Sequence, residues 1–400
     1  MTSTDELTCI VVVFLVWLLI SLLESWKGVV EKRPNERNTY IDGLRAILAL
    51  FVVAHHQIQV GYFLRSGSLY MAEISKVNKF LGPWSVSMFF ALTAYLFTSK
   101  LLADQVHQNI IRYYYRLFAF RCVRLIPLAI VSTVIGFILL SLSQYNKLSL
   151  FTKLELTSFF NFAGFASSSM FGKSVVPSIS GIESWEGTVL FGPHWSLHYE
   201  WVFYFTLPLL GLFTRIKSSV VLILLWCSLG ILVARFTNDS HYLEFLPGVI
   251  VAVLSRINRF NGVGKNKSFG FFCCVLLLTS IFVDRHKLLI VSNTLFLFAI
   301  VAQNRVMAFM GKQWLTNIGE RTYSIYLLHV IPLYITAKIC LLTHIDVGSL
   351  TQIGTIQFFF PAVYVVQTVA VMVLSAICYR YIEKPALLGG RGVVATLFSR

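Results

Sequence analysis

About eleven long apolar runs dominate this sequence and constrain its fold more than any other feature. A helix needs about 20 mostly apolar residues to cross the hydrocarbon core of a bilayer. Only 13% of the residues are charged, against roughly 25% in a typical water-soluble protein. We therefore expect an all-α fold, a polytopic membrane helical bundle with about ten core transmembrane helices plus one N-terminal helix. The runs lie at about residues 8–23, 44–60, 84–99, 125–145, 195–214, 218–236, 241–255, 268–283, 288–303, 322–342 and 356–380.

The charges predict how the chain is oriented. Lys and Arg number 33 and Asp and Glu 18, a net charge of +15. In a soluble chain such an excess suggests nucleic-acid binding, but in a membrane protein it gathers in cytoplasmic loops. Asp5 and Glu6 precede the first run, and four basic residues between 27 and 37 follow it. We predict an integral protein of a bacterial inner membrane, with its N-terminus outside, its C-terminus cytoplasmic and no nucleic-acid partner.

The loops suggest a division into three parts. We expect an N-terminal anchor and basic linker over residues 1–39, a membrane domain over 40–388 and a cytoplasmic tail over 389–400. A long external loop at about 146–193 is either a lid or acceptor surface, or an ordinary flexible loop. The seven cysteines lie within or beside apolar runs, which argues against a disulfide framework and against a metal site.

Ionisable residues inside apolar runs indicate function, because burying them in a membrane is costly. Arg45 and His56 are eleven residues apart, so at about 100° per residue they share a helix face. At 1.5 Å per residue, His56 lies about 16 Å further along the axis, near mid-membrane. His55 points about 80° away from that face, so we favour His56 as a catalytic base. A structural histidine bonded to a neighbouring helix is the alternative.

A second polar group opens the run that begins near His194. Glu200 lies six residues further on, about 9 Å below the outer boundary of the membrane, at the expected depth of His56. A carboxylate beside an imidazole fixes its tautomer and stabilises the protonated ring. We expect Glu200 to assist His56; a structural glutamate is the alternative.

The third group is a basic loop ahead of Pro127, with arginines at 112, 116, 121 and 124. Arg121 and Arg124 are three residues apart and share a helix face, an arrangement that suits a phosphate. A plain cytoplasmic basic loop is the alternative. The sequence has no Walker-type phosphate loop, GxSxG elbow or HExxH spacing, which disfavours ATP-driven transport, serine hydrolysis and zinc-dependent proteolysis.

Six segments, in this order, resemble the integral-membrane acyltransferase family three, whose members include O-acetyltransferases of bacterial surface polysaccharides. They cover about residues 40–388. Where the family often has Ser-Gly, this chain has Thr93 and Ala94, so the helix packing there is expected to differ. The segments are YIDGLRAILALFVVAHH (40–56), SVSMFFALTAYLFT (85–98), FRCVRLIP (120–127), HWSLHYEWVFYFTLP (194–208), NIGERTYSIYLLH (317–329) and YIEKP (381–385).

The resemblance implies acyl transfer. The family's arginine and histidine fall on Arg45 and His56, and its Trp-Ser-Leu-x-x-Glu motif ends at Glu200. It implies acyl-CoA, usually acetyl-CoA, as the cytoplasmic donor, with no metal. The acceptor is expected to be a glycan or lipid-linked sugar hydroxyl. The donor-binding residues are then Arg45, Arg116, Arg121 and Arg124, and the acceptor-binding residues Trp195, Ser196, His198 and Tyr199.

Alternatives of other classes stay open at this point. His56 acts either as a general base or as a nucleophile that carries the acyl group itself. A small metabolite is a second acceptor class. A proton-coupled transporter or flippase of an anionic lipid-linked sugar uses the same residue types, although no inverted repeat is visible. A scaffold without chemistry is a third class.

Overall fold

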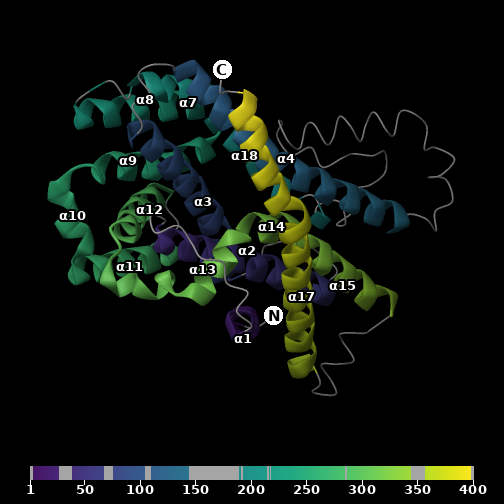
Figure 1. Ribbon diagram of the computed structural model, residues 1–400. Coiled ribbons are helices and arrows are strands. Elements are labelled where there is room, and N and C mark those ends of the chain that lie inside the picture. Colours follow the sequence, from purple (N-terminus) through teal and green to yellow (C-terminus); the bar gives the residue numbers. More distant parts are fainter. Residues whose placement is uncertain are drawn as a thin grey trace.

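The structure, a computed structural model, describes residues 3–26, 38–66, 75–103, 110–143, 189–190, 192–213, 216, 218–283, 286–343 and 356–397. Over these residues it is all helical, which confirms the predicted all-α membrane bundle (Figure 1). The predicted external loop at 146–193 lies almost wholly outside them. The helices are α1 (Ser3–Trp26), α2 (Thr39–Ser66), α3 (Lys76–Ala103), α4 (Ile110–Ser143), η3 (Gly192–His194), α7 (Trp195–Phe213), α8 (Ser219–Thr237), η4 (Ser240–Phe245), α9 (Leu246–Leu254), α10 (Asn258–Lys265), α11 (Lys267–Phe282), α12 (His286–Val301), η5 (Arg305–Gly311), α13 (Gln313–Glu320), α14 (Thr322–Leu328), α15 (Val330–Leu342), α17 (Ile356–Cys378), η6 (Tyr379–Glu383) and α18 (Lys384–Leu397).

Fewer helices are long enough to span a membrane than the apolar runs predicted. Within the described residues seven have the required length and hydropathy, or eight if the bent pair α12 and η5 forms one span. The segment Ser240–Leu254 and helix α11 are apolar but too short. Helix α7 is 19 residues long, but His198 and Glu200 make its first two turns polar. Helix length and hydropathy therefore support seven or eight of the predicted spans within the described residues.

Helix α2 is the centre of the bundle. Of its apolar span, 78% is buried inside the molecule, against 11% for α8, so α8 faces the bilayer. Helix α2 packs against α1, α3, η5 and α13. One apolar core surrounds α2, and a second lies between α3, α4, α7 and α9, with α3 contributing to both.

Three glycines allow backbones to touch where side chains would keep helices apart. A Cβ on Gly43 of α2 would lie 1.9 Å from the carbonyl oxygen of Met310, and one on Gly319 of α13 would lie 2.1 Å from that of Asp42. On the other side, a Cβ on Gly248 of α9 would lie 1.8 Å from the carbonyl oxygen of Ala91. These contacts fix the beginning of α2 against η5 and α13, and the middle of α3 against α9.

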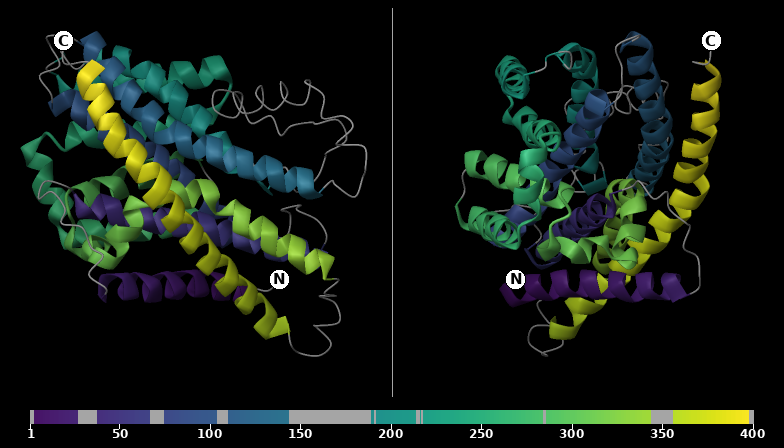
Figure 2. Two further views of the ribbon diagram at one scale, coloured as in Figure 1. Left: turned by 45° about the vertical axis from the view of Figure 1, so that its right-hand side comes forward. Right: turned by 60° about the vertical axis from the view of Figure 1, so that its left-hand side comes forward.

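Helices α17, η6 and α18 form one long column across the molecule (Figure 2). Its middle, η6, is a π-helical turn, a widened turn often found at functional sites. Helix α1 lies along one edge of the bundle in both views of Figure 2, against α2, α13 and α17. The column therefore contacts α1 near one end and α4 near the other.

Candidate active site

A cavity of about 100 Å³ opens between α2, α3, α4, α7 and α14. Its apolar wall comes mainly from α3, including Phe89 and Phe90. The polar residues at this cavity combine three cations with one carboxylate and several hydroxyl groups. Among them are Arg45, Arg121, Arg124, Ser196, Glu200 and Tyr326.

Aromatic rings hold Arg121 in place. Its guanidinium carbon lies 4.3 Å from the ring centre of Phe97 and 5.4 Å from that of Tyr204, at cation–π distance. The hydroxyl of Tyr204 donates a hydrogen bond of 2.7 Å to Glu200. Glu200 is therefore tied to the aromatic residue that packs against Arg121.

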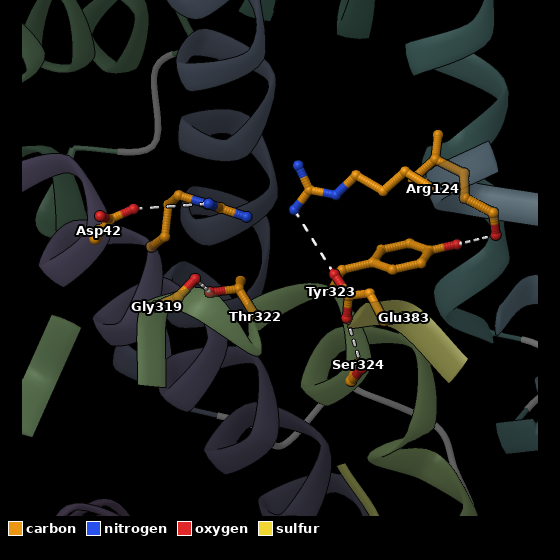
Figure 3. A network of polar contacts seen from close by, with 9 residues as sticks. Asp42, Arg124, Gly319, Thr322, Tyr323, Ser324 and Glu383 are labelled. Carbon is orange, nitrogen blue, oxygen red and sulfur yellow. Dashed lines mark hydrogen bonds and ion pairs between the residues drawn. The ribbon is translucent and has the colours of Figure 1, made fainter. Parts of the chain in front are cut away.

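Arg124 is held by an acid from the far end of the chain. Its Nη2 lies 3.8 Å from Oε1 of Glu383, which is 1% exposed. Ser324 donates a hydrogen bond of 2.6 Å to the other oxygen of Glu383, and the Tyr323 hydroxyl donates one of 2.7 Å to the carbonyl of Leu125. Figure 3 shows Arg124 reaching from α4 toward Glu383, with the Tyr323 ring beside it. The π-turn η6 thus brings a buried acid to Arg124, which lines the cavity.

Arg45 lies on the α2 side of this network. Its guanidinium is 3.8 Å from Asp42, one turn earlier. The glycine contacts of Gly43 and Gly319 lie beside this pair. Arg45 therefore projects from the most tightly packed part of α2.

The hydrogen bonds around His55 and His56 define one consistent set of proton positions. Nδ1 of His55 donates to the carbonyl and Oδ1 of Asn78, at 2.9 and 3.1 Å, so Nε2 of neutral His55 is an acceptor. The amide nitrogen of Gln59 donates to this Nε2 at 2.9 Å, and the amide oxygen of Gln59 accepts from Nδ1 of His56 at 2.8 Å. His56 therefore carries its proton on Nδ1 and a lone pair on Nε2. We call His55, His56, Gln59 and Asn78 together the imidazole relay.

A second imidazole, that of His329, packs beside the His56 ring. Among the described residues, Nδ1 is the only side-chain atom of His56 that makes a hydrogen bond. His329 packs beside it, with ring centres 5.0 Å apart and planes tilted by 34°. Nδ1 of His329 lies 2.7 Å from the carbonyl of Tyr326, and its buried Nε2 has no partner in the part of the chain that the structure describes. Two imidazole rings thus lie side by side.

Tyr326 links the cavity to these rings. It lines the cavity, its hydroxyl lies 2.8 Å from that of Ser196, and its ring centre is 6.2 Å from that of His329. Ring contacts through Tyr326 and His329 therefore connect the cavity to His56. His56 itself is not one of the residues that line the cavity.

The structure brings together some of the predicted site residues. Arg45, Arg121, Arg124, Ser196 and Glu200 line the same cavity. The expected contact between Glu200 and His56 is absent: Glu200 accepts from Tyr204, whereas His56 bonds Gln59. A shared depth in the membrane does not bring the two side chains together, because contact also depends on the direction in which each helix presents its side chain.

The remaining predicted donor and acceptor residues lie elsewhere. Arg116 is exposed and does not line the cavity. Tyr199 donates a hydrogen bond of 2.6 Å to Asp239, and Nε2 of His198 lies 3.2 Å from the Tyr242 hydroxyl. Trp195 packs 5.4 Å from His241, measured between ring centres. Trp195, His198 and Tyr199 therefore contact the segment after α8 rather than the cavity.

Sequence reasoning assigned no role to Gln59, Tyr326, His329 or Glu383. Gln59 lies three residues after His56 and four after His55, the spacing at which helical side chains meet. This signal was present in the sequence. The same rule connects Tyr326 to His329. No local pattern pairs Glu383 with Arg124, because the two are far apart in the chain and meet only through the π-turn.

The fold and cavity together define a membrane-embedded helical protein with a cationic cavity, connected through Tyr326 to a pair of imidazoles. Comparison with protein-family models matches residues 38–380 to an acyltransferase domain, that of acyltransferase family three. The chain therefore belongs to this family and is a membrane acyltransferase, as the resemblance predicted. Comparison with curated proteins and with solved structures finds no match.

Proposed function

We propose that this protein is an O-acyltransferase that moves an acetyl group from cytoplasmic acetyl-CoA to a hydroxyl group of a surface-glycan or lipid-linked sugar acceptor. Family membership supports acyl transfer over transport. The observation that carries the proposal is the imidazole relay, which leaves Nε2 of His56 as an open lone pair. A neutral imidazole with a free nitrogen is the group that general-base catalysis near neutral pH requires.

The cavity supports the donor side of the proposal. Coenzyme A carries several phosphates, and arginine guanidinium groups bind phosphate oxygens through paired N–H donors. Arg45, Arg121 and Arg124 present three cations to one cavity. The aromatic contacts of Arg121 orient its guanidinium before the donor binds, which reduces the entropy cost of binding. In this proposal the phosphates stay with the arginines, and the thioester end passes Tyr326 to reach His56.

In the proposed reaction, His56 accepts the proton from the acceptor hydroxyl and later returns it to the leaving thiolate. The acceptor oxygen attacks the thioester carbonyl while Nε2 of His56 takes the hydroxyl proton. A carbon–oxygen bond forms, the carbon–sulfur bond breaks, and the protonated imidazole returns its proton to the departing thiolate. The products are the acetyl ester and free coenzyme A thiol. General-base help of this kind contributes about 10² to 10⁴ in rate.

Glu200 receives a different role from the one its depth suggested. It bonds Tyr204, whose ring faces Arg121. We therefore assign Glu200 to balancing the positive charge of the cavity. Gln59 replaces it as the group that orients the His56 ring.

The test is acetyl transfer by the purified protein. Incubation with labelled acetyl-CoA and an acceptor extract should give labelled ester and an equal amount of free thiol, whereas a transporter releases no thiol. His56→Ala should abolish both products while the variant elutes and melts like the parent. A fully active His56→Ala variant would exclude the base role.

The same purified protein can be used to distinguish direct transfer from a mechanism in which His56 carries the acetyl group covalently. Acetyl exchange between labelled and unlabelled coenzyme A without acceptor, together with ping-pong kinetics, supports an acyl-histidine intermediate. A strict requirement for both substrates supports direct transfer.

A further inference from the structure

Helix α1 lies outside residues 38–380, which the family model matches, yet it carries a buried acid that contacts the beginning of α3. Glu6 is 4% exposed. One of its oxygens accepts hydrogen bonds from the Tyr62 hydroxyl at 3.1 Å and from the backbone N–H of Ser75 at 3.2 Å. The Ser75 hydroxyl donates to the other oxygen. Three donors thus stabilise a carboxylate that would be costly to bury alone.

Ser75 connects Glu6 to Asn78 through hydrogen bonds. It directly precedes α3, and its hydroxyl oxygen accepts from the backbone N–H of Asn78 at 3.2 Å, the hydrogen bond that caps a helix N-terminus. Asn78 is fully buried, and its two oxygens accept from Nδ1 of His55. The bonds of Glu6 therefore fix the helix end that orients His55.

The His55 ring has little freedom to adopt another position. A Cβ on Gly82, one turn after Asn78, would lie 2.5 Å from the ring of His55. The ring thus packs directly on the α3 backbone. Displacement of the beginning of α3 is then transmitted to His55 and, through Gln59, to His56.

We propose that Glu6 of α1 is a positioning residue for acyl transfer, acting through Ser75, Asn78 and the imidazole relay on the orientation of His56. This inference rests on the proposed role of His56 as the base. In this protein the extra N-terminal helix is a part of the catalytic apparatus as well as a membrane anchor.

The experiment compares three variants of the full-length protein in the acetyl-transfer assay. Glu6→Ala removes the acceptor of three hydrogen bonds and should lower kcat roughly tenfold, with the KM for acetyl-CoA unchanged. Glu6→Gln should restore most of kcat, because an amide both accepts from N–H and donates to a hydroxyl. Asp5→Ala is the matched control: Asp5 lies in the same helix turn and pairs with Arg65 at 3.3 Å.

A double-mutant cycle with Gln59→Leu tests the connection directly. If Glu6 acts through the relay, the loss in the double variant should be clearly smaller than the product of the two single losses. Multiplicative losses would overturn the proposal. Equal losses in Glu6→Ala and Asp5→Ala would also overturn it, because α1 would then act only as an anchor.

A variant that leaves α1 intact covers the case in which Glu6→Ala does not fold. Gly82→Ala pushes on the His55 ring from α3 and should lower kcat with KM unchanged; full activity in this variant would contradict the relay. The two proposals can be refuted independently. An active His56→Ala variant would refute the role of His56 as the base. An inactive His56→Ala variant together with a fully active Glu6→Ala variant would refute only the positioning role of Glu6.

Discussion

Replacing Gln59 by leucine tests whether the tautomer of His56 controls the rate of acyl transfer. In the structure Gln59 makes one hydrogen bond of 2.8 Å to Nδ1 of His56 and another of 2.9 Å to Nε2 of His55. Leucine has a similar size but can make neither bond. His56 can then place its proton on Nε2, where it blocks the lone pair that the reaction uses.

The expected loss follows from the strength of these two bonds. Each contributes a net stabilisation of about 1 kcal/mol, so the productive arrangement of His56 loses about 1 to 2 kcal/mol. That corresponds to a fall in kcat of roughly 5- to 30-fold. The KM for acetyl-CoA should stay constant, because Gln59 does not line the cavity.

Steady-state rates with labelled acetyl-CoA measure both quantities, and Gln59→Glu is the matched control. A glutamate still accepts from Nδ1 of His56 but cannot donate to His55 when ionised. It should keep more activity than leucine, because it preserves the hydrogen bond that holds the proton on Nδ1. A leucine variant with kcat within a factor of two of the parent would refute the tautomer argument.

Two further predictions concern the donor cavity and the packing of α2. Arg121→Ala should raise the KM for acetyl-CoA about tenfold or more, since a hydrogen-bonded charge contact contributes about 1.5 to 3 kcal/mol, whereas Arg116→Ala should leave it unchanged because Arg116 is exposed. Equal KM values for the two variants would place the phosphates outside the cavity. Gly319→Ala places a methyl group 2.1 Å from the carbonyl oxygen of Asp42, an overpacking that costs about 1 to 3 kcal/mol. The melting temperature in detergent should fall, and an unchanged value would show that the helices separate at little cost.

The sequence predicted the features that depend on local periodicity. Apolar run length identified the seven long spans. The shared helix face of Arg45 and His56 remains a prediction, since Arg45 lines the cavity and His56 does not. The three-residue spacing of Arg121 and Arg124 correctly placed both at one site. Each of these inferences uses only the geometry of a single helix.

The remaining features depend on how distant segments pack. Depth in the membrane suggested that Glu200 meets His56, but depth does not determine the direction in which α7 presents Glu200. Packing of Trp201 and Tyr204 against neighbouring helices sets that direction. Glu383 reaches Arg124 only because η6 widens the helix by a π-turn, a change with no signature in apolar periodicity.

The amide between the two histidines also determines where a proton can travel. Unlike an imidazole or a carboxylate, the side chain of Gln59 has no group that titrates near neutral pH. A proton taken up by His56 therefore has no onward route to His55. In the proposed reaction it leaves with the thiol from the same ring, so the two histidines do not form a proton wire through Gln59.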